Sequence, residues 1–495
     1  MVSTIKTFTF VGIKAIAVDV EVKISSGRTI FNIVGLPDKA LAESRERIRA
    51  AINSIGLEMP AKRITVNLAP ADLEKEGSHF DLAIALGILA EMAIIDKFEL
   101  ENYYCLGELS LNGRIKPVNG ILSAAITANE LNGNIICPKE SGSEAIYASK
   151  DINILAPNNI LQLINHFKGT QILSQPEQNF KYNSPSYPCL SEVRGQKRAK
   201  RALEIAAAGN HNMLMIGPPG SGKSMISSRL NGILPELTLD EMLEVNMINS
   251  ISGNIQDGQL ITERPFRAPH HSCSMPAMVG GGIKTKPGEI SLSHNGVLFL
   301  DELGEFPRQV LDSLRQPIED HIVTISRANS HITYPANFQL VAAMNPCRCG
   351  YLGNENKSCN RAPKCGQDYQ AKISGPILDR MDIIINVPQI NIFSQTSEVP
   401  EEKSSEIIKR VKFAREKQYK RSGKLNSHNN SKEIEETFSF TGENRNLIEK
   451  AIEKMDISMR GFTRILKTAR TIADLENSDK IETHHLAEAI GYRSG

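Results

Sequence analysis

The sequence predicts an α/β fold in which a parallel sheet occupies the middle of the chain, after a mixed α+β domain and before a helical region. Apolar strands alternate with helices as far as about Val387, which is the pattern of a parallel α/β domain. One strand, at 212–216, runs into a glycine-rich loop and a helix, and another ends in two acidic residues. This combination is typical of sheets that bind phosphate groups.

The composition is that of an ordinary folded protein. The 495 residues correspond to about three domains, and the net charge of +1 gives no general attraction to nucleic acid or membrane. The longest apolar stretch, 80–95, contains Asp81 and Glu91 and is too short to span a bilayer, and the first residues do not form a signal peptide. We therefore expect a cytoplasmic protein without membrane contact, in which cysteines stay reduced.

Four regions follow one another along the chain. Residues 1–168 mix strands and helices, including a helix over 37–56 with Asp38 in its first turn and Gly56 at its end. Residues 169–188 are polar and rich in Pro, Ser and Asn, which predicts a linker. The central sheet is expected over 189–392 and a helical domain over 393–495.

The glycine-rich loop fits the phosphate-loop motif G-x-x-x-x-G-K-[ST] in full. Backbone amides of such a loop bind phosphates at the start of a helix. Lys223 is expected to reach the β- and γ-phosphates of ATP, and Ser224 to hold Mg²⁺. The nucleotide-binding residues are predicted to be Gly217, Pro218, Pro219, Gly220, Ser221, Gly222, Lys223, Ser224 and Asp301.

Two further strands end in polar residues. "GVLFLDEL" places Asp301 where it can hold Mg²⁺ and Glu302 where it can activate water. "LVAAMNP" places Asn345 at a strand end, where its amide would face the attacking water or the γ-phosphate. The alternative is that Asn345 only caps a turn before Pro346.

Several segments together resemble one family, the magnesium-chelatase-like AAA+ ATPases of the ComM/YifB type. They occur in the family's order over nearly the whole chain: "VRGQKRAKRALEIAAAGNHNMLMIGPPGSGKSM", "FRAPHHSCSMPAMVGGG", "GEISLSHNGVLFLDELGEF", "LRQPIED", "MNPCRCG", "SGPILDRMDI" and "SMRGFTRILKTARTIADLE". The resemblance implies a P-loop AAA+ sheet with a C-terminal helical lid. It also implies a homo-hexameric ring with ATP bound between subunits.

The same resemblance assigns two arginines. Arg380 in "ILDR" would be the arginine finger that reaches a neighbour's γ-phosphate, and Arg460 in "SMRG" would be the sensor arginine of the lid. Arg380 could instead form an ion pair with Asp379 or Asp382. Two other arginines, Arg464 and Arg470, lie on the same predicted helix and are alternatives for the sensor.

Four of the eight cysteines lie within one short segment. Their spacing is C-x-C, nine residues, C, five residues, C, in the residues Cys347, Cys349, Cys359 and Cys365. Two close pairs of thiolates can form a tetrahedral Zn²⁺ site, and many members of the resembled family carry a cysteine cluster here, although others lack it. We expect a structural Zn²⁺, with free surface thiols as the alternative.

The segment after "RAPHHSCS" resembles the helix-2 insert of this AAA+ clade, which faces the pore of the ring. Its adjacent histidines, His270 and His271, point in different directions on any regular element and are not expected to bind metal. Lys284 and Lys286 follow in a glycine-rich stretch and would contact a phosphate backbone.

The N-terminal region resembles the proteolytic domain of Lon, a ribosomal S5 domain 2-like fold. The position of the catalytic serine falls on His79 and that of the catalytic lysine on Leu122, with Ser78 one residue away. A protease fold without the serine–lysine dyad is expected, because fold alone does not carry activity.

A basic segment lies in the C-terminal region. Eight basic residues between Lys409 and Lys424 accompany the single acid Glu416, and an apolar stripe leaves several of them outward. The outward residues are expected to be Arg410, Lys417, Lys420 and Arg421. Such a face suits contacts with DNA phosphates, although a solvated helix has the same pattern.

Three functions fit these observations. An ATP-hydrolysing ring motor on branched or single-stranded DNA, driving branch migration or unwinding during recombination of incoming DNA in natural transformation, is what the resemblance favours. A metal-chelatase motor subunit would require partner subunits for porphyrin chemistry. A protein remodeller or ATP-dependent protease is disfavoured by the missing dyad.

Overall fold

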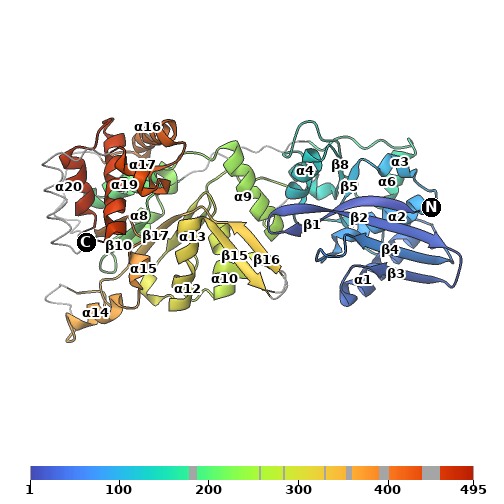
Figure 1. Ribbon diagram of the computed structural model, residues 1–495, viewed down its shortest axis with the longest axis horizontal. Coiled ribbons are helices and arrows are strands. Elements are labelled where there is room, and N and C mark those ends of the chain that lie inside the picture. The colour runs from blue at the N-terminus through green and yellow to red at the C-terminus, as the bar shows by residue number, and fades with distance from the viewer. Residues whose placement is uncertain are drawn as a thin grey trace. The chain divides into compact units, whose positions relative to one another are not determined.

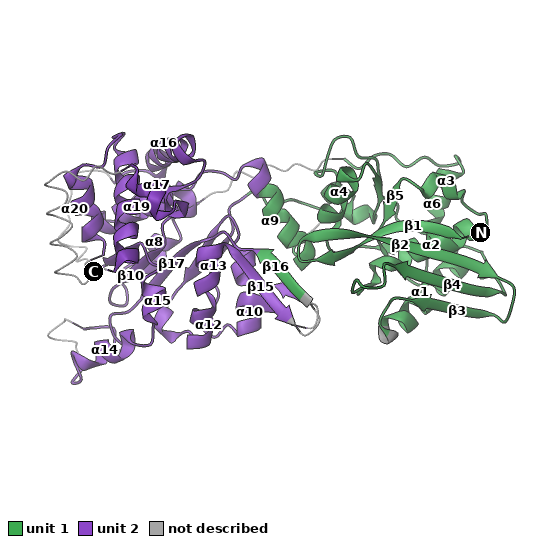
Figure 2. Ribbon diagram, viewed as in Figure 1, with its two compact units in different colours: residues 1–183, 242–262, 328–334 green, residues 184–241, 263–327, 335–495 purple. Residues whose placement is uncertain are grey.

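The computed structural model describes residues 2–177, 187–255, 258–282, 285–327, 330–352, 359–389, 401–437 and 458–493. The chain divides into two compact units, coloured green and purple in Figure 2. The first unit comprises Met1–Asn183, Met242–Thr262 and Ala328–Tyr334, and the second comprises Ser184–Glu241, Glu263–Arg327 and Pro335–Gly495. The expected boundary at 392/393 and residues 178–186 of the expected linker fall outside the described residues.

The first unit is built on a mixed seven-stranded sheet in the order β3-β4-β2-β1-β5-β8-β9. The long hairpin of β1 (Ser3–Val11) and β2 (Lys14–Ser25) is antiparallel, whereas β1 pairs with β5 in parallel. The remaining strands are β3 (Ile30–Val34), β4 (Arg63–Ala69), β5 (Tyr103–Cys105), β8 (Asn134–Ile136) and β9 (Ile154–Leu155), with a separate pair of β6 (Glu108–Leu109) and β7 (Ile115–Lys116). The predicted mixed α+β character of this region is confirmed.

The helices of the first unit cover this sheet. They are α1 (Asp38–Ser54), α2 (Asp81–Glu91), α3 (Lys97–Leu100), α4 (Ile121–Glu130), α5 (Gly142–Ala145) and α6 (Ile160–Phe167). The apolar stretch 80–95 supplies α2, which is buried along most of its length. Its first residue, Asp81, is buried beside Arg47 (2.6 Å). Among the described helices, none is long and apolar enough to cross a membrane.

The second unit contains a five-stranded parallel sheet in the order β11-β14-β17-β10-β18. Figure 1 labels two of its strands, β17 and β10. Its strands are β11 (Phe266–Arg267), β14 (Val297–Leu300), β17 (Gln339–Met344), β10 (Met213–Ile216) and β18 (Ile383–Asn386). All neighbouring pairs are parallel, so the predicted parallel sheet is confirmed. The central strand β17 is buried at all six residues, because it has a neighbour on each side and apolar cover on both faces.

Helices surround the sheet of the second unit. They are α7 (Lys197–Gly209), α8 (Lys223–Ser227), α10 (Met275–Val279), α11 (Glu289–Leu292), α12 (Arg308–Ser313), α13 (Arg315–Asp320), α14 (Lys364–Gln370), α15 (Gly375–Leu378), α16 (Ser404–Ser422), α17 (Ser431–Glu435), α19 (Met459–Leu475) and α20 (Thr483–Gly491). The C-terminal helices α16 and α19 pack against α7 and share one apolar core with it.

The remaining elements are short or belong to both units. α9 (Leu239–Ser252) begins in the second unit and continues in the first. The pair of β12 (Gly280–Gly281) and β13 (Lys286–Pro287) is antiparallel, and β15 (Ile322–Arg327) and β16 (Ser330–Pro335) follow. Of the two lysines expected to contact a phosphate backbone, Lys286 is exposed on β13, whereas Lys284 lies outside the described residues.

Candidate nucleotide-binding site

The phosphate loop connects β10 to α8 at the carboxyl edge of the parallel sheet. Lys223, the first residue of α8, donates through Nζ to the carbonyls of Gly217 (2.7 Å) and Pro218 (3.0 Å). Burial lowers the pKa of Lys223, and the charges of Asp301 and Glu302 oppose that shift. The ammonium group of Lys223 therefore lies against the backbone of the phosphate loop, beside the amides that begin α8.

The acidic end of β14 meets the hydroxyl of the phosphate loop. Ser224 Oγ donates to Asp301 Oδ2 at 2.7 Å. Glu302 follows with a left-handed backbone (φ 53°) and a side chain that is 54% exposed, so its carboxylate reaches the open side of the pocket. Hydroxyl and carboxylate oxygens are ligands that Mg²⁺ prefers. The residues predicted to hold the cation and activate water thus lie together.

Asn345 completes the pocket from β17. This strand lies between β14 and β10, so its carboxyl end adjoins both motifs. Lys223 Nζ donates to Asn345 Oδ1 at 3.2 Å. The cavity has a volume of about 320 Å³ and is lined by Pro219, Gly220, Ser221, Gly222, Lys223, Ser224, Met225, Asp301, Glu302, Met344 and Asn345. The amide of Asn345 therefore belongs to the pocket wall.

Three residues at this site were not predicted from the sequence. His271 Nδ1 lies 3.3 Å from Glu302 Oε2. Gln196 donates to the carbonyl of Ser221 (3.2 Å), and Gln389 donates to that of Pro219 (2.9 Å). The pair "HH" was visible, but its position beside Glu302 depends on β11 being the neighbour of β14, which the order of strands along the chain does not reveal.

Arg380 lies at the opposite, amino edge of the sheet, shortly before β18. Its guanidinium pairs with Glu319 (2.8 Å) and donates to the carbonyls of Arg315 (3.0 Å) and Pro376 (2.8 Å). The alternative pairing with Asp379 or Asp382 is wrong, because the carboxylate at the guanidinium belongs to Glu319. Arg380 does not line the pocket of its own chain.

The three candidate sensor arginines of α19 have different surroundings. Arg464 Nη1 pairs with buried Asp382 (2.5 Å), and Arg470 is buried against Asp474 (3.0 Å). Arg460, in the first turn, is exposed, and within the described ranges it makes no ion pair. Two of the alternatives are therefore occupied in internal ion pairs, which leaves Arg460 available to bind a ligand.

Profiles of one protein family match most of the chain. Residues 20–141 match "Subunit ChlI of Mg-chelatase", residues 189–394 match "Magnesium chelatase, subunit ChlI", and residues 401–493 match "Magnesium chelatase, subunit ChlI C-terminal". The competence protein ComM of Haemophilus influenzae is 45% identical over 492 residues, which are 98% of this chain and 96% of ComM. The chain belongs to the magnesium-chelatase ChlI-like family.

Other members of the ChlI-like family differ in how much of the chain they match. The protein YifB of Escherichia coli is 44% identical over 496 residues, 99% of this chain and 97% of YifB. The magnesium-chelatase subunit ChlI of Trieres chinensis is 24% identical over 190 residues, 34% of this chain and 54% of that subunit. The chain is therefore a magnesium-chelatase-like AAA ATPase, and membership of the family implies ATP hydrolysis.

The pocket of this ChlI-like ATPase fits the ATP and Mg²⁺ that the family implies. Ser224 and Asp301 already share a hydrogen bond at 2.7 Å and present oxygen ligands, and the amides that open α8 suit phosphate oxygens. When bound, Mg²⁺ neutralises charge that develops on the phosphate oxygens. Lys223 would exchange its carbonyl partners for phosphate, while Asn345 and Glu302 line the side open to water.

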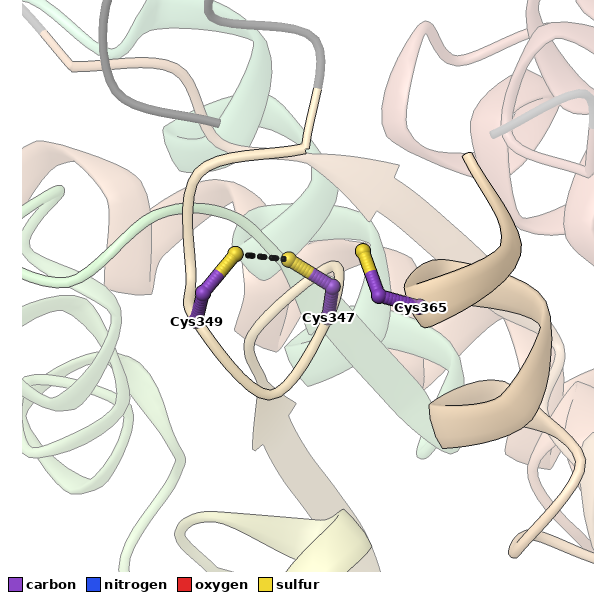
Figure 3. A group of neighbouring side chains, drawn as sticks. All are labelled: Cys347, Cys349 and Cys365. Carbon is purple, nitrogen blue, oxygen red and sulfur yellow. Dashed lines mark hydrogen bonds between the residues drawn. The ribbon is translucent and has the colours of Figure 1, made fainter. Parts of the chain in front are cut away.

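The cysteine cluster (Cys347, Cys349, Cys359 and Cys365) begins two residues after Asn345. The sulfurs of Cys347, Cys349 and Cys365 all lie within 4.8 Å of one another. Figure 3 shows these three side chains. Hydrogen bonds from the Tyr351 backbone, from Cys347 and from Cys359 lower the pKa of Cys349 to about 6. Burial and the neighbouring thiol of Cys359 raise the pKa of Cys365 to about 12. The fourth cysteine, Cys359, thus adjoins Cys349 and Cys365.

The basic face expected on α16 is largely paired with acids. Arg410 pairs with Glu204 (2.6 Å) and Glu402, and Arg421 pairs with Asp474 (2.6 Å). Lys417 lies 3.9 Å from Asp479. Carboxylates therefore neutralise the two arginines in this structure, and contact of this helix face with DNA phosphates stays a prediction.

The positions that correspond to the catalytic serine and lysine of Lon are occupied by other residues in the first unit. His79 is buried with Nε2 3.0 Å from the Phe8 carbonyl, and burial lowers its pKa to about 4. Leu122 is buried at the start of α4. Ser78 donates to the carboxylate of Glu108. The residues described at these positions form no serine–lysine pair.

Proposed function

We propose that this protein is an ATP-driven ring motor that acts on branched or single-stranded DNA, with helicase or branch-migration activity in the recombination of incoming DNA. The observation that carries the proposal is similarity to a competence protein over 98% of the chain, together with a pocket lined by the phosphate loop, Asp301, Glu302 and Asn345. Similarity confined to the ATPase core would support any AAA motor. Similarity that also covers the N-terminal unit supports a function in DNA uptake and recombination, in line with the name of the competence protein ComM.

Hydrolysis in the proposed motor uses residues of one pocket. Glu302 accepts the proton of the attacking water, and Asn345 orients that water or the γ-phosphate. Lys223 and the backbone of the phosphate loop hold the phosphates, while Ser224 and Asp301 hold Mg²⁺. His271, 3.3 Å from Glu302, fixes the direction of the carboxylate.

The remaining site residues act between subunits of a homo-hexamer. Arg380 lies at the sheet edge opposite its own pocket, which suits a finger that completes the pocket of a neighbour. When the interface between two subunits forms, the Arg380 guanidinium leaves Glu319, from which it is 2.8 Å away in the isolated chain, and reaches the neighbour's nucleotide. Arg460, exposed at the start of α19, serves as the sensor of the bound nucleotide.

The proposed domain organisation follows from this assignment. Residues 1–168 form a Lon-protease-like domain without protease activity, 169–188 form a linker, 189–392 form the AAA+ core with its insert and cysteine cluster, and 393–495 form the lid. The mixed sheet of the first unit and the non-catalytic residues at His79 and Leu122 support the first of these assignments.

A chelatase or protein-remodelling motor is the alternative. The ChlI subunit of Trieres chinensis matches only 34% of the chain, so the hypothesis of a chelatase motor has less support than that of a DNA motor. A remodeller would be stimulated by unfolded protein instead of DNA.

One experiment separates these functions. Phosphate release by the purified protein is measured with a forked duplex, single-stranded DNA, linear duplex, an unfolded protein, or no addition, and strand displacement is followed on a labelled fork. We expect stimulation by forked or single-stranded DNA and ATP-dependent displacement, both lost in the matched variant Glu302→Gln. Stimulation by unfolded protein alone, or activity indifferent to DNA, would contradict the proposal.

A further inference from the structure

Three sulfurs of the cysteine cluster, those of Cys347, Cys349 and Cys365, are arranged for one metal ion, and Cys359 adjoins Cys349 and Cys365. Zn–S bonds of about 2.3 Å place the sulfurs of a tetrahedral site roughly 3.8 Å apart. Cys347 Sγ and Cys349 Sγ are 3.1 Å apart, and with Cys365 they fit within 4.8 Å. Small movements of side chains would bring these sulfurs to the tetrahedral distance.

The cluster differs from the other thiols of the chain. Cys105 and Cys137 are fully buried in the apolar cores of the first unit, where burial raises the pKa of each thiol. In the cluster only Cys347 is fully buried, and the other three are partly exposed. Thiols that converge at a partly exposed loop, outside an apolar core, are ligands that select Zn²⁺ among the common divalent cations.

The first pair of cysteines lies on a turn that touches the phosphate loop. The amide of Gly350 donates to the Cys347 carbonyl (2.9 Å). Gly350 has a left-handed backbone (φ 83°), and a Cβ at this position would lie 2.7 Å from Pro219 Cδ. The turn therefore approaches Pro219 more closely than any residue with a side chain could.

The last cysteine lies on α14, which contacts the two other walls of the pocket. Gln370 donates to the Pro346 carbonyl (3.3 Å), directly after Asn345. The ring of Tyr369 packs on Gly304, two residues after Glu302, where a Cβ would lie 2.6 Å from Tyr369 Cζ. A metal bound by Cys365 and by the first pair of cysteines would therefore connect α14 with the turn that contacts Pro219. Figure 3 shows Cys365 on its helix beside Cys347 and Cys349.

We infer that Cys347, Cys349, Cys359 and Cys365 bind one Zn²⁺, and that the metal holds residues 346–350 and α14 together against the phosphate loop and the turn after Glu302. Four thiolates fill the tetrahedral shell and leave no open position for catalysis. The metal therefore acts by fixing the shape of the nucleotide pocket. This second effect rests on the nucleotide site proposed above, whereas the metal site itself does not.

The metal is tested without nucleotide. Elemental analysis of the full-length protein should give close to one zinc per chain, and thiol titration should find the four cluster thiols protected until a chelator is added. Cys359→Ser with Cys365→Ser should lose the zinc, and the matched control Cys189→Ser should keep it. Replacement of the metal by Co²⁺ should produce the absorption bands of a tetrahedral tetrathiolate site.

The effect on the pocket is tested by affinity for a fluorescent ATP analogue. We expect roughly tenfold weaker binding after chelation of folded protein, checked by circular dichroism, and restoration by added Zn²⁺. Gly350→Ala should keep the zinc yet weaken binding several-fold, because its Cβ displaces Pro219.

The outcomes distinguish the two parts of the inference. A protein that contains no zinc, takes up no Co²⁺ and has four freely titrating thiols, or a disulfide among them, would overturn the metal site whatever the ATPase does. A zinc protein whose nucleotide affinity is unchanged by chelation and by Gly350→Ala would overturn the effect on the pocket. If the cysteine double variant fails to fold, the chelation and Gly350→Ala measurements on intact clusters still decide both parts.

Discussion

The two edges of the parallel sheet in the second unit both carry charged residues, but they use them differently. At the carboxyl edge, Lys223, Asp301 and Glu302 line a cavity of about 320 Å³. Lys223 donates to carbonyls of its own loop, and Asp301 accepts from Ser224. At the amino edge, Asp382 and Arg464 are paired at 2.5 Å, and Asp382 is almost completely buried. Charges without permanent partners are available to a ligand, and charges that are fully paired maintain the fold.

Asn212 connects the strands of the amino edge. Its amide N–H donates to Asp382 Oδ2 (2.9 Å), its Oδ1 accepts from the Leu340 amide (2.9 Å), and its Nδ2 donates to the Arg380 carbonyl (3.3 Å). Burial raises the pKa of Asp382, but the charges of Arg464 and His211 outweigh it and hold that pKa well below the usual range. Arg380 is the residue of this edge that we assign to function.

The largest effect is expected at Arg380. Arg380→Ala should bind ATP normally but hydrolyse it roughly 10³- to 10⁵-fold more slowly, because the transition state loses the charge that a finger supplies. The measurement is phosphate release from assembled protein. Glu319→Gln is the matched control, because it removes the carboxylate that pairs with Arg380 and leaves the finger in place.

Mixing variants tests whether the finger acts on a neighbour. Rings that combine Arg380→Ala with Lys223→Ala chains contain some intact composite sites, so partial activity should return. If subunits exchange, as fluorescence energy transfer between labelled chains would establish, and no activity returns, Arg380 does not act in trans and belongs with the structural charges of its edge.

A smaller loss is expected from the carboxyl edge itself. Glu302→Gln should bind ATP as the native protein does while hydrolysis falls about 10²- to 10⁴-fold, the usual range for removing a general base. Lys223→Ala should lose binding instead, because the phosphates lose their ammonium partner. Binding of a fluorescent ATP analogue and single-turnover hydrolysis separate the two. Equal loss of binding in both variants would contradict the role given to Glu302.

Much of the carboxyl edge was predictable because its signals are local. The phosphate loop needs only the segment from 217 to 224, and Asp301 and Glu302 follow an apolar strand that is recognisable by itself. A parallel sheet then brings strand ends to one edge, whatever the order of the strands. Asn345 could be placed by the same reasoning.

The partners of charged residues were not predictable in the same way. Glu319 at Arg380, Glu204 at Arg410 and Asp474 at Arg421 are all far from their partners in sequence. Helical spacing shows which face a residue occupies, but the carboxylate opposite depends on tertiary packing. For the same reason the contact of Gly350 with Pro219 could not be read from "NPCRCG".

The smallest effect, and the one that tests the comparison most directly, separates two arginines on α19. Arg464→Ala leaves Asp382 buried without its main partner, and breaking such a pair typically costs about 3 kcal/mol or more in the free energy of unfolding. Arg460→Ala, at an exposed position, should leave stability within about 0.5 kcal/mol of the native protein and weaken ATP binding or hydrolysis. Chemical denaturation and nucleotide binding are measured on both variants.

The loss of stability in Arg464→Ala should depend on pH in a direction that the pKa of Asp382 determines. Because the pKa of Asp382 is depressed in the folded state, its contribution to stability is present above the unfolded value of about 3.9 and is lost as the pH falls through the folded value. In Arg464→Ala, Asp382 keeps the burial that raises its pKa and loses the main charge that lowers it, so its carboxyl group is protonated at a higher pH than in the native protein. The stability difference between the native protein and the variant should shrink as the pH is lowered from 7 towards 4, because protonation relieves the unpaired charge of the variant. A difference that is independent of pH, or a stability loss of the same size in Arg460→Ala, would show that the two arginines do not divide into a structural and a functional one.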